Sequence, residues 1–238
     1  MTTSSDRESG KAIVRNGRSF LPGIIANDLS GDIQAQTREA FKNVDACLAE
    51  IGSDRTRVLM VHIWLSDMAL FQDMTSVWND WVDADIPPSR SCVRAKPITE
   101  NALLEVIATA AVPSTVWGRQ PIERFGMVRG PGRPTMCLGL GIGDWYTVCI
   151  IAPDCTTGIV GQTQQILQMF DDYLAEAGTD KAHLLTAEIW LKNMVDIDAV
   201  NAIWREWLGN AGRPAVSLVR ADMAQPEMLI EIRITAAR

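Results

Sequence analysis

Residues that build metal and redox centres are scarce in this sequence. It contains two histidines, His62 and His183, and neither lies at a spacing typical of metal ligands. The five cysteines are odd in number and form no Cys-x-x-Cys pair, which favours free thiols in a reducing compartment. There is also no P-loop, and no GxGxxG that follows a strand. These absences argue against a zinc enzyme and a Ser-His-Asp hydrolase, and we expect a protein that works without a cofactor or a metal.

Clusters of positive charge and long apolar runs are missing as well. The formal net charge is −7 and no Lys/Arg cluster stands out, so nucleic acid is a poor partner. No apolar run reaches the length of a membrane span, and the N-terminal MTTSSDRESGK lacks the apolar stretch of a signal peptide. We therefore expect a cytoplasmic protein that binds neither nucleic acid nor membrane. The hydrophobic content of 47% suffices for a packed core.

What the sequence does contain is a long internal repeat. Residues 86–95 read IPPSRSCVRA and residues 212–221 read GRPAVSLVRA, which aligns Arg90 with Val216 at an offset of 126 positions. The same offset aligns three tryptophans, an Ile-Ile-Ala triplet, a Gln-Thr pair and a glutamate: Trp64/Trp190, Trp78/Trp204, Trp81/Trp207, 24–26/150–152, 36–37/162–163 and Glu105/Glu231. A repeat of this length indicates a duplicated domain and not a solenoid.

A boundary between the two copies is visible in the composition. Residues 113–133, PSTVWGRQPIERFGMVRGPGR, are rich in proline and glycine. Such punctuation is typical of a segment between domains. We predict a first domain over 1–112, a linker over 113–133 and a second domain over 134–238.

Each copy shows the same order of secondary-structure signals. Asn16-Gly17 predicts a type I′ turn between two short strands. Apolar residues at helical spacing predict one helix over about 32–51, ended by Gly52, and a second that carries a Trp and Met stripe best explained by core packing. Three further strands are expected over 57–65, 89–95 and 103–112. The resulting ββαβαββ order predicts an α+β fold, with both helices on one face of a mixed sheet.

Several of these segments resemble the RidA/YjgF family of enamine/imine deaminases. They are GDIQAQTREAFKNVDACLAEIGSDRTRV, IWLSDM, PPSRSCVRA and ALLEVIATAAV in the first copy, with looser matches in IWLKNM, RPAVSLVRA and MLIEIRITAA of the second. The resemblance implies a chorismate-mutase-like ββαβαββ domain and trimers with clefts between neighbouring subunits. We expect a homo-oligomer of three two-domain chains, as a sheet covered by helices on one face only also favours.

The resemblance also implies candidate site residues in the first copy. Arg90 stands where the family has the arginine of its P-A-R-S segment, and its guanidinium would bind the carboxylate of a 2-imino or 2-enamino acid bidentately. Glu105, on the last strand, would direct the attacking water. Gly23 and Cys92 would help to frame the substrate, and Thr75 stands where the family has an asparagine.

The second copy keeps a different subset of these residues. Asn201 aligns with Thr75 and restores the asparagine, while Glu231 aligns with Glu105. The anchor arginine, however, is replaced by Val216, which cannot bind a carboxylate through its side chain. We therefore expect the second copy to be structural, or to bind something less acidic.

Two functions of different class follow from this pattern. One is an imine/enamine deaminase that releases a keto acid and ammonia, with aminomuconate-like acids as candidate substrates by analogy alone. The alternative is a non-catalytic protein that binds a small carboxylate or serves as a scaffold. Ribonuclease activity, attached to some relatives, is disfavoured by the acidic charge. Without the resemblance, Arg90 is a solvated strand-end arginine, Glu105 a partner in a structural ion pair and Cys92 an inert thiol.

Overall fold

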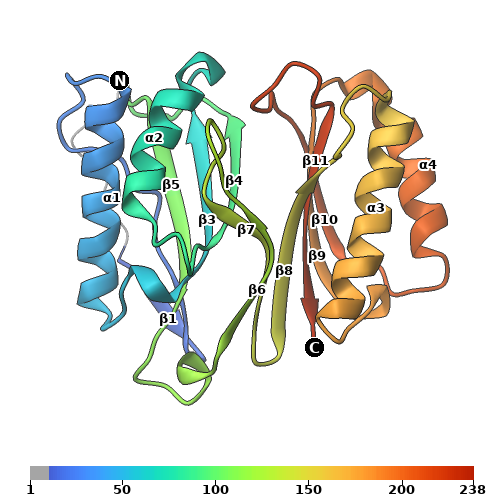
Figure 1. The fold of residues 1–238 in the computed structure, drawn as a ribbon, viewed down its shortest axis with the longest axis horizontal. Coiled ribbons are helices and arrows are strands. Elements are labelled where there is room, and N and C mark those ends of the chain that lie inside the picture. The colour runs from blue at the N-terminus through green and yellow to red at the C-terminus, as the bar shows by residue number, and fades with distance from the viewer. Residues whose placement is uncertain (1–10) are drawn as a thin grey trace. The chain divides into compact units, whose positions relative to one another are not determined.

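The computed structural model describes residues 11–238, so the first ten residues of the predicted first domain lie outside it. The chain divides into two compact units (Figure 1). Unit 1 holds the described residues up to Ile122 together with Met127–Cys137, and unit 2 holds Glu123–Gly126 with Leu138–Arg238. None of the helices in the described part is long and apolar enough to cross a membrane.

Unit 1 has the expected ββαβαββ order. Its strands and helices are β1 (Ile13–Arg15), β2 (Arg18–Phe20), α1 (Ile33–Glu50), β3 (Val58–Leu65), α2 (Phe71–Trp81), β4 (Ser89–Arg94) and β5 (Leu104–Ala111), with short 3-10 turns at Arg55–Arg57 and Met68–Leu70. The strands lie in the order β1-β2-β5-β3-β4, and only the β3–β4 pair of this set is parallel. Both helices cover the same face of this sheet (Figure 1).

Residues at the ends of the elements explain where the strands and helices of unit 1 begin and end. Asn16 and Gly17 both have positive φ, 50° and 82°, as a type I′ turn between β1 and β2 requires. Asp32 caps the start of α1 by accepting a hydrogen bond from the Ala35 amide at 2.8 Å. Gly52, at φ 69°, follows the end of the same helix.

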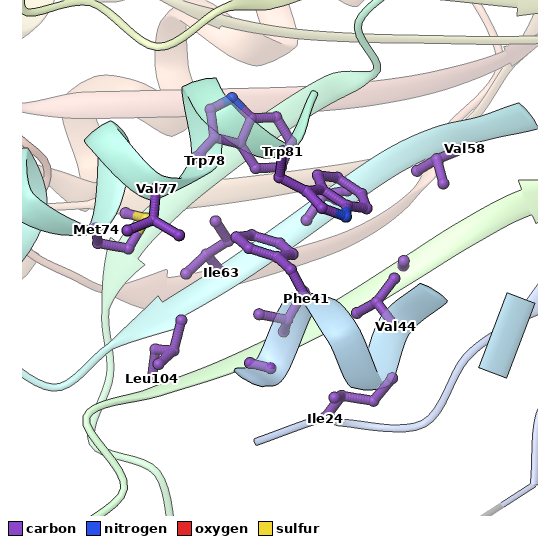
Figure 2. Close-up of a cluster of buried hydrophobic side chains, with 14 of the residues drawn as sticks. Ile24, Phe41, Val44, Val58, Ile63, Met74, Val77, Trp78, Trp81 and Leu104 are labelled. Atoms are coloured by element: carbon purple, nitrogen blue, oxygen red, sulfur yellow. The ribbon is translucent and has the colours of Figure 1, made fainter. Parts of the chain in front are cut away.

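The core of unit 1 lies between the helices and the sheet. Figure 2 shows Phe41 from α1 close to Trp81 of α2, with Ile63 and Leu104 contributed by the sheet. The Phe41 and Trp81 rings stack with centroids 4.6 Å apart. The Trp and Met stripe of α2 therefore packs the core, as its helical spacing indicates.

The second copy repeats the architecture, and the first two residues of its strand β7, Met136 and Cys137, belong to unit 1. Its elements are β7 (Met136–Ile142), β8 (Trp145–Ile151), α3 (Ile159–Glu176), β9 (Leu184–Leu191), α4 (Ile197–Leu208), β10 (Ala215–Arg220) and β11 (Ile230–Ala237), with 3-10 turns at Lys181–His183 and Met194–Asp196. The strand order is β7-β8-β11-β9-β10, and β9–β10 is the parallel pair that corresponds to β3–β4. The α+β prediction with its duplicated domain is confirmed.

The segment expected to be a plain linker contains regular structure. A 3-10 turn covers Trp117–Arg119, and β6 (Ile122–Val128) pairs with β7. The prolines of this segment and its other glycines flank β6, whereas Gly126 lies inside the strand with a positive φ of 62°. Part of β6, Glu123–Gly126, belongs to unit 2, where the Phe125 ring meets Tyr146 edge-on.

The glutamine of the repeated Gln-Thr pair is buried and makes the same set of hydrogen bonds in both copies. The Gln36 amide donates to three backbone carbonyls, those of Leu29, Gly31 and Asn101, and accepts from the Leu103 amide at 2.9 Å. Gln162 makes the equivalent four bonds in unit 2, with the carbonyls of Cys155, Thr157 and Glu227 and the amide of Leu229. Each glutamine thus ties the loop before a long helix to the loop before the last strand.

Candidate functional site

Arg90 is a buried cation on strand β4. The residue is only 2% exposed, and its Nη2 donates a hydrogen bond to Thr75 Oγ1 at 3.2 Å. The guanidinium carbon lies 5.2 Å from the Phe71 ring and 5.0 Å from the Trp78 ring, within the range of cation–π attraction. The Met74 sulfur is 3.6 Å from the same Nη2. Arg90 is therefore not the solvated strand-end arginine that the sequence would indicate without the family resemblance.

Local sequence explains how α2 presents these groups to the guanidinium. Phe71, Met74, Thr75 and Trp78 occupy positions i, i+3, i+4 and i+7, so they share one face of the helix. Strand register places Arg90 beside Val61 of β3, whose side chain lies in the core under the helices. Of these neighbours, Thr75 was a candidate site residue in the sequence prediction, and the aromatic side chains were assigned to the core alone.

Glu105 and Gly23 form a second group. Glu105 is 6% exposed on β5, and a Cβ atom built on Gly23 would lie 1.9 Å from its Oε1. No side chain fits at position 23 unless the carboxylate moves. The glycine of the resemblance therefore has a physical role in unit 1: it leaves room for the carboxylate of Glu105.

The sheet separates these two groups within unit 1. Residues in register share a face, and successive residues alternate between faces. Arg90 registers with Val61, whereas Glu105 registers with Trp64, three positions further along β3. Arg90 thus points to the helix face and Glu105 to the opposite face. Cys92 lies on the helix face and belongs to the hydrophobic core, so no single face of unit 1 holds all five candidate residues.

A histidine lies on the same face as Glu105. His62 is 8% exposed, and its Nδ1 is 2.8 Å from the hydroxyl of Ser91, the neighbour that strand register provides. The His62 ring also meets Trp64 edge-on at 5.2 Å. The hydrogen bond gives His62 a structural role, because it joins the side chains of β3 and β4.

Unit 2 replaces the first-copy groups with different chemistry. Val216, the counterpart of Arg90, is 49% exposed. Cys149, the counterpart of Gly23, donates its thiol to Glu231 Oε1 at 3.1 Å. Burial, together with the charge of Glu231, raises the pKa of the Cys149 thiol well above its usual range, so this thiol stays protonated at neutral pH. Asn201 lies half-buried on α4.

Arg233 is a buried charge that the sequence interpretation missed. It is 2% exposed on β11, its Nη1 is 3.6 Å from Glu188 Oε2, and its guanidinium lies 5.7 Å from the Trp190 ring. The signal was present as the single arginine in the apolar run IEIRITAA. A charge in such a strand requires a polar partner. Over residues 11–238 there is no group of three or more His, Cys, Asp and Glu side chains that could hold a metal.

The two ββαβαββ units define a tandem α+β protein of chorismate-mutase-like architecture. In the first unit, a buried arginine contacts side chains of the second helix. The chain belongs to the RidA/YjgF family: the family model described as Endoribonuclease L-PSP matches residues 9–112 and 154–238. The family prediction is confirmed, and the two matched segments fall in the two copies.

Individual relatives agree with this assignment. A RutC family protein of Haemophilus influenzae is 37% identical over 98 residues, which cover 41% of this chain and 84% of the relative. The diphthine–ammonia ligase of Schizosaccharomyces pombe is 25% identical over 235 residues, which cover 92% of this chain and 37% of that protein. A chorismatase crystal structure covers 96% of this chain and 80% of its own at a TM-score of 0.65 and 14% identity, a similarity of fold alone.

Proposed function

We propose that the protein is an imine/enamine deaminase whose substrate carries a carboxylate recognised by Arg90. The observation that carries the proposal is the burial of that guanidinium at the arginine position of the family motif, held by Thr75 and two aromatic rings. A buried guanidinium cannot lose its proton and binds a carboxylate through two parallel hydrogen bonds. Membership of the family supports the general role.

The reaction needs little beyond placement of the reactants. An enamine first tautomerises to the imine, water then adds to the C=N carbon, and the resulting carbinolamine expels ammonia to leave the keto acid. Arg90 would fix the substrate through its carboxylate, and a glutamate would orient the attacking water and accept its proton. Ammonia carries away the nitrogen and the transferred protons, so the reaction balances without a redox partner. Aminomuconate-like acids remain candidate substrates.

The opposite orientation of Arg90 and Glu105 constrains where that glutamate comes from. Because the two side chains lie on different faces of one sheet, Glu105 would not serve the Arg90 of its own unit. Glu105 and Glu231 hold this position in the two copies. This supports the expectation of a homo-oligomer of three chains, which we retain as a proposal in a cytoplasmic setting.

The deaminase is tested with 2-imino acids generated in situ by an amino-acid oxidase, with ammonia and keto acid as the products measured. Arg90→Ala and Arg90→Lys should each lower the enzyme-dependent rate by about 100-fold, since a buried charge contact is worth ~2–5 kcal/mol and 1.4 kcal/mol is a factor of ten. Arg94→Ala, an exposed arginine of the same strand, is the matched control and should retain activity.

The same assay identifies the glutamate. Either Glu105→Gln or Glu231→Gln should abolish turnover while substrate binding persists. The proposal is overturned if wild-type protein releases no ammonia above the uncatalysed rate, or if Arg90→Ala equals Arg94→Ala.

A non-catalytic carboxylate-binding protein is the second candidate. The separation of Arg90 from Glu105 favours it, because binding needs the guanidinium alone. Saturable binding of a keto acid that is lost in Arg90→Ala, combined with no ammonia release, would identify this function.

A further inference from the structure

Arg90 is closed off from solvent, although the proposed function needs a ligand to reach it. The residue is 2% exposed, and its guanidinium faces helix α2, where it meets the Phe71 and Trp78 rings. A carboxylate that binds through two parallel hydrogen bonds must lie edge-on to the guanidinium. Part of the surrounding structure must therefore move before such a ligand binds.

A short segment lies against α2, and we call its residues 133–137 the strap. The Thr135 carbonyl accepts a hydrogen bond from Trp78 Nε1 at 2.8 Å, so the strap holds one of the two rings that meet the guanidinium. The side chain of Asn79 bonds the strap twice: its Nδ2 donates to the Arg133 carbonyl at 3.0 Å, and its Oδ1 accepts from the Thr135 amide at 2.7 Å. All of these residues belong to unit 1, so the contact is a feature of that unit alone.

The strap also contacts the start of β4. The Cys137 amide donates to the Pro88 carbonyl at 3.2 Å, and the Cys137 thiol donates to the Pro87 carbonyl at 3.4 Å. Ser89, the chain neighbour of Arg90, pairs with Cys137 in parallel. The strap thus joins α2 to the outer edge of β4, the two elements that surround the guanidinium.

The strap is held less firmly than α2 or β4. Strand β4 pairs with β3 along its whole length, whereas its pairing with the strap is limited to one residue. Helix α2 is fixed in the core by Trp78, which is 0% exposed. Gly130 and Gly132, just before the strap, are exposed and have positive φ of 122° and 69°. The strap can therefore detach while the sheet and the core stay intact.

The second copy shows the equivalent strand without a strap. Five of the six residues of β4 are buried, whereas none of the six residues of β10 is buried. Within residues 11–238, β10 pairs with β9 alone. Val216, at the position of Arg90, is 49% exposed. This position is thus accessible where the outer edge of the strand has no strap, which supports the strap as the part that covers Arg90.

We propose that the strap is a movable cover, and that a carboxylate reaches the Arg90 guanidinium only after residues 133–137 leave α2 and β4. Closed molecules do not bind, so the apparent affinity for a carboxylate falls with the fraction of molecules that are open. The inference rests on the role of Arg90 in the proposed function, and it concerns access to the guanidinium and not the chemistry that follows.

A reversible lock tests the cover. Ser89 and Cys137 are register partners, and adjacent strands lie about 4.8 Å apart, within the roughly 4.4–6.8 Å between Cα atoms that a disulfide spans. Ser89→Cys should therefore form a disulfide with the native Cys137 on mild oxidation and hold the strap closed. Phenylglyoxal, which modifies accessible guanidinium groups, should then label Arg90 at least tenfold more slowly than after reduction and removal of the reductant, as measured by mass spectrometry of the peptides.

Two controls accompany the lock. Arg94, an exposed arginine of the same strand, should be labelled at the same rate in the oxidised and the reduced protein. Ser89→Ala, which cannot form the disulfide, should label Arg90 equally with and without oxidant.

Weakening the strap on its helix side should have the opposite effect. Asn79→Ala removes both side-chain bonds to the strap and should raise the rate of Arg90 labelling about tenfold, as expected for the loss of two hydrogen bonds. The association rate of 2-oxobutyrate, followed by stopped-flow tryptophan fluorescence, should rise by the same factor. Gln72→Ala, which removes an exposed amide from the same helix, is the matched control and should change neither rate.

The labelling results separate this inference from the proposed function. Equal labelling of Arg90 in the locked and the reduced protein, or no acceleration in Asn79→Ala, overturns the cover. A guanidinium that is never labelled while Arg94 reacts also overturns it, because Arg90 would then never become accessible. Labelling as expected without any release of ammonia would keep the cover and reject the deaminase.

Discussion

At the scale of the residue, the exchange of glycine for cysteine between the copies decides how a buried glutamate is held. In unit 1, Gly23 leaves space for the Glu105 carboxylate, which would otherwise lie 1.9 Å from a Cβ. In unit 2, Cys149 fills that position and donates its thiol to Glu231 at 3.1 Å. Glu105 thus has space because position 23 has no side chain, whereas its counterpart Glu231 accepts a hydrogen bond from the side chain at position 149.

Gly23→Ala should therefore destabilise the protein through Glu105. Overpacking of a close-packed site costs about 1–3 kcal/mol of unfolding free energy. Adding Glu105→Ala to this variant should recover much of the loss, because the clashing carboxylate is gone, and the two changes should be strongly non-additive in urea unfolding. Gly212→Ala is the control, since its Cβ would meet the Ala182 carbonyl at an ordinary 3.6 Å. Additive costs would show that the clash is relieved elsewhere.

At the scale of the element, the long helices α1 and α3 begin differently although they hold the same place in their copies. Asp32 caps α1 with its side chain, whereas the equivalent Gly158 of α3 has no side chain to offer. Their backbones nevertheless agree, with φ −69° and ψ 177° at Asp32 and φ −66° and ψ 179° at Gly158. The backbone of α3 is therefore already suited to a capping aspartate.

Asp32→Ala should lower the free energy of unfolding by about 1 kcal/mol, the usual cost of losing a side-chain cap. Gly158→Asp should raise it by a few tenths of a kcal/mol, since the new carboxylate can accept from the first-turn amides. Urea denaturation of both variants measures the two changes. A loss of stability in Gly158→Asp would show that the loop before α3 resists the added side chain.

Hydrophobic periodicity and the internal repeat predicted the positions of most helices and strands. The helix expected over about 32–51 is α1 at Ile33–Glu50, and the strand expected over 57–65 is β3 at Val58–Leu65. Strand β6 was missed because its short alternating run lies between proline and glycine signals that indicate a linker. The separation of Arg90 from Glu105 was also out of reach, because it depends on the register of three strands that are distant in the sequence.

At the scale of the whole molecule, each unit has a hydrophobic core of its own. Phe41 is central to the first, stacked on Trp81, and Phe170 is central to the second, beside Trp207. The two phenylalanines lie at different positions of the repeat, because Phe41 aligns with Leu167 and Phe170 aligns with Val44. Each core therefore has its large ring at a different place along the long helix.

Phe41→Ala and Phe170→Ala should each cost about 3–5 kcal/mol, but in different places. Hydrogen exchange followed by mass spectrometry should show faster exchange of α1, β3 and β5 in the first variant and of α3, β9 and β11 in the second. Phe20→Ala, an exposed phenylalanine of β2, should leave both patterns unchanged in a dilute monomeric sample. Equal acceleration of all six elements in either variant would mean that the units open as one.

The absence of a guanidinium at position 216 fixes the number of binding sites for any ligand that an arginine must bind. Each chain has two domains but only one arginine at this position, Arg90. An oligomer of any size would therefore have one site of the Arg90 type for each chain, which is half as many sites as domains.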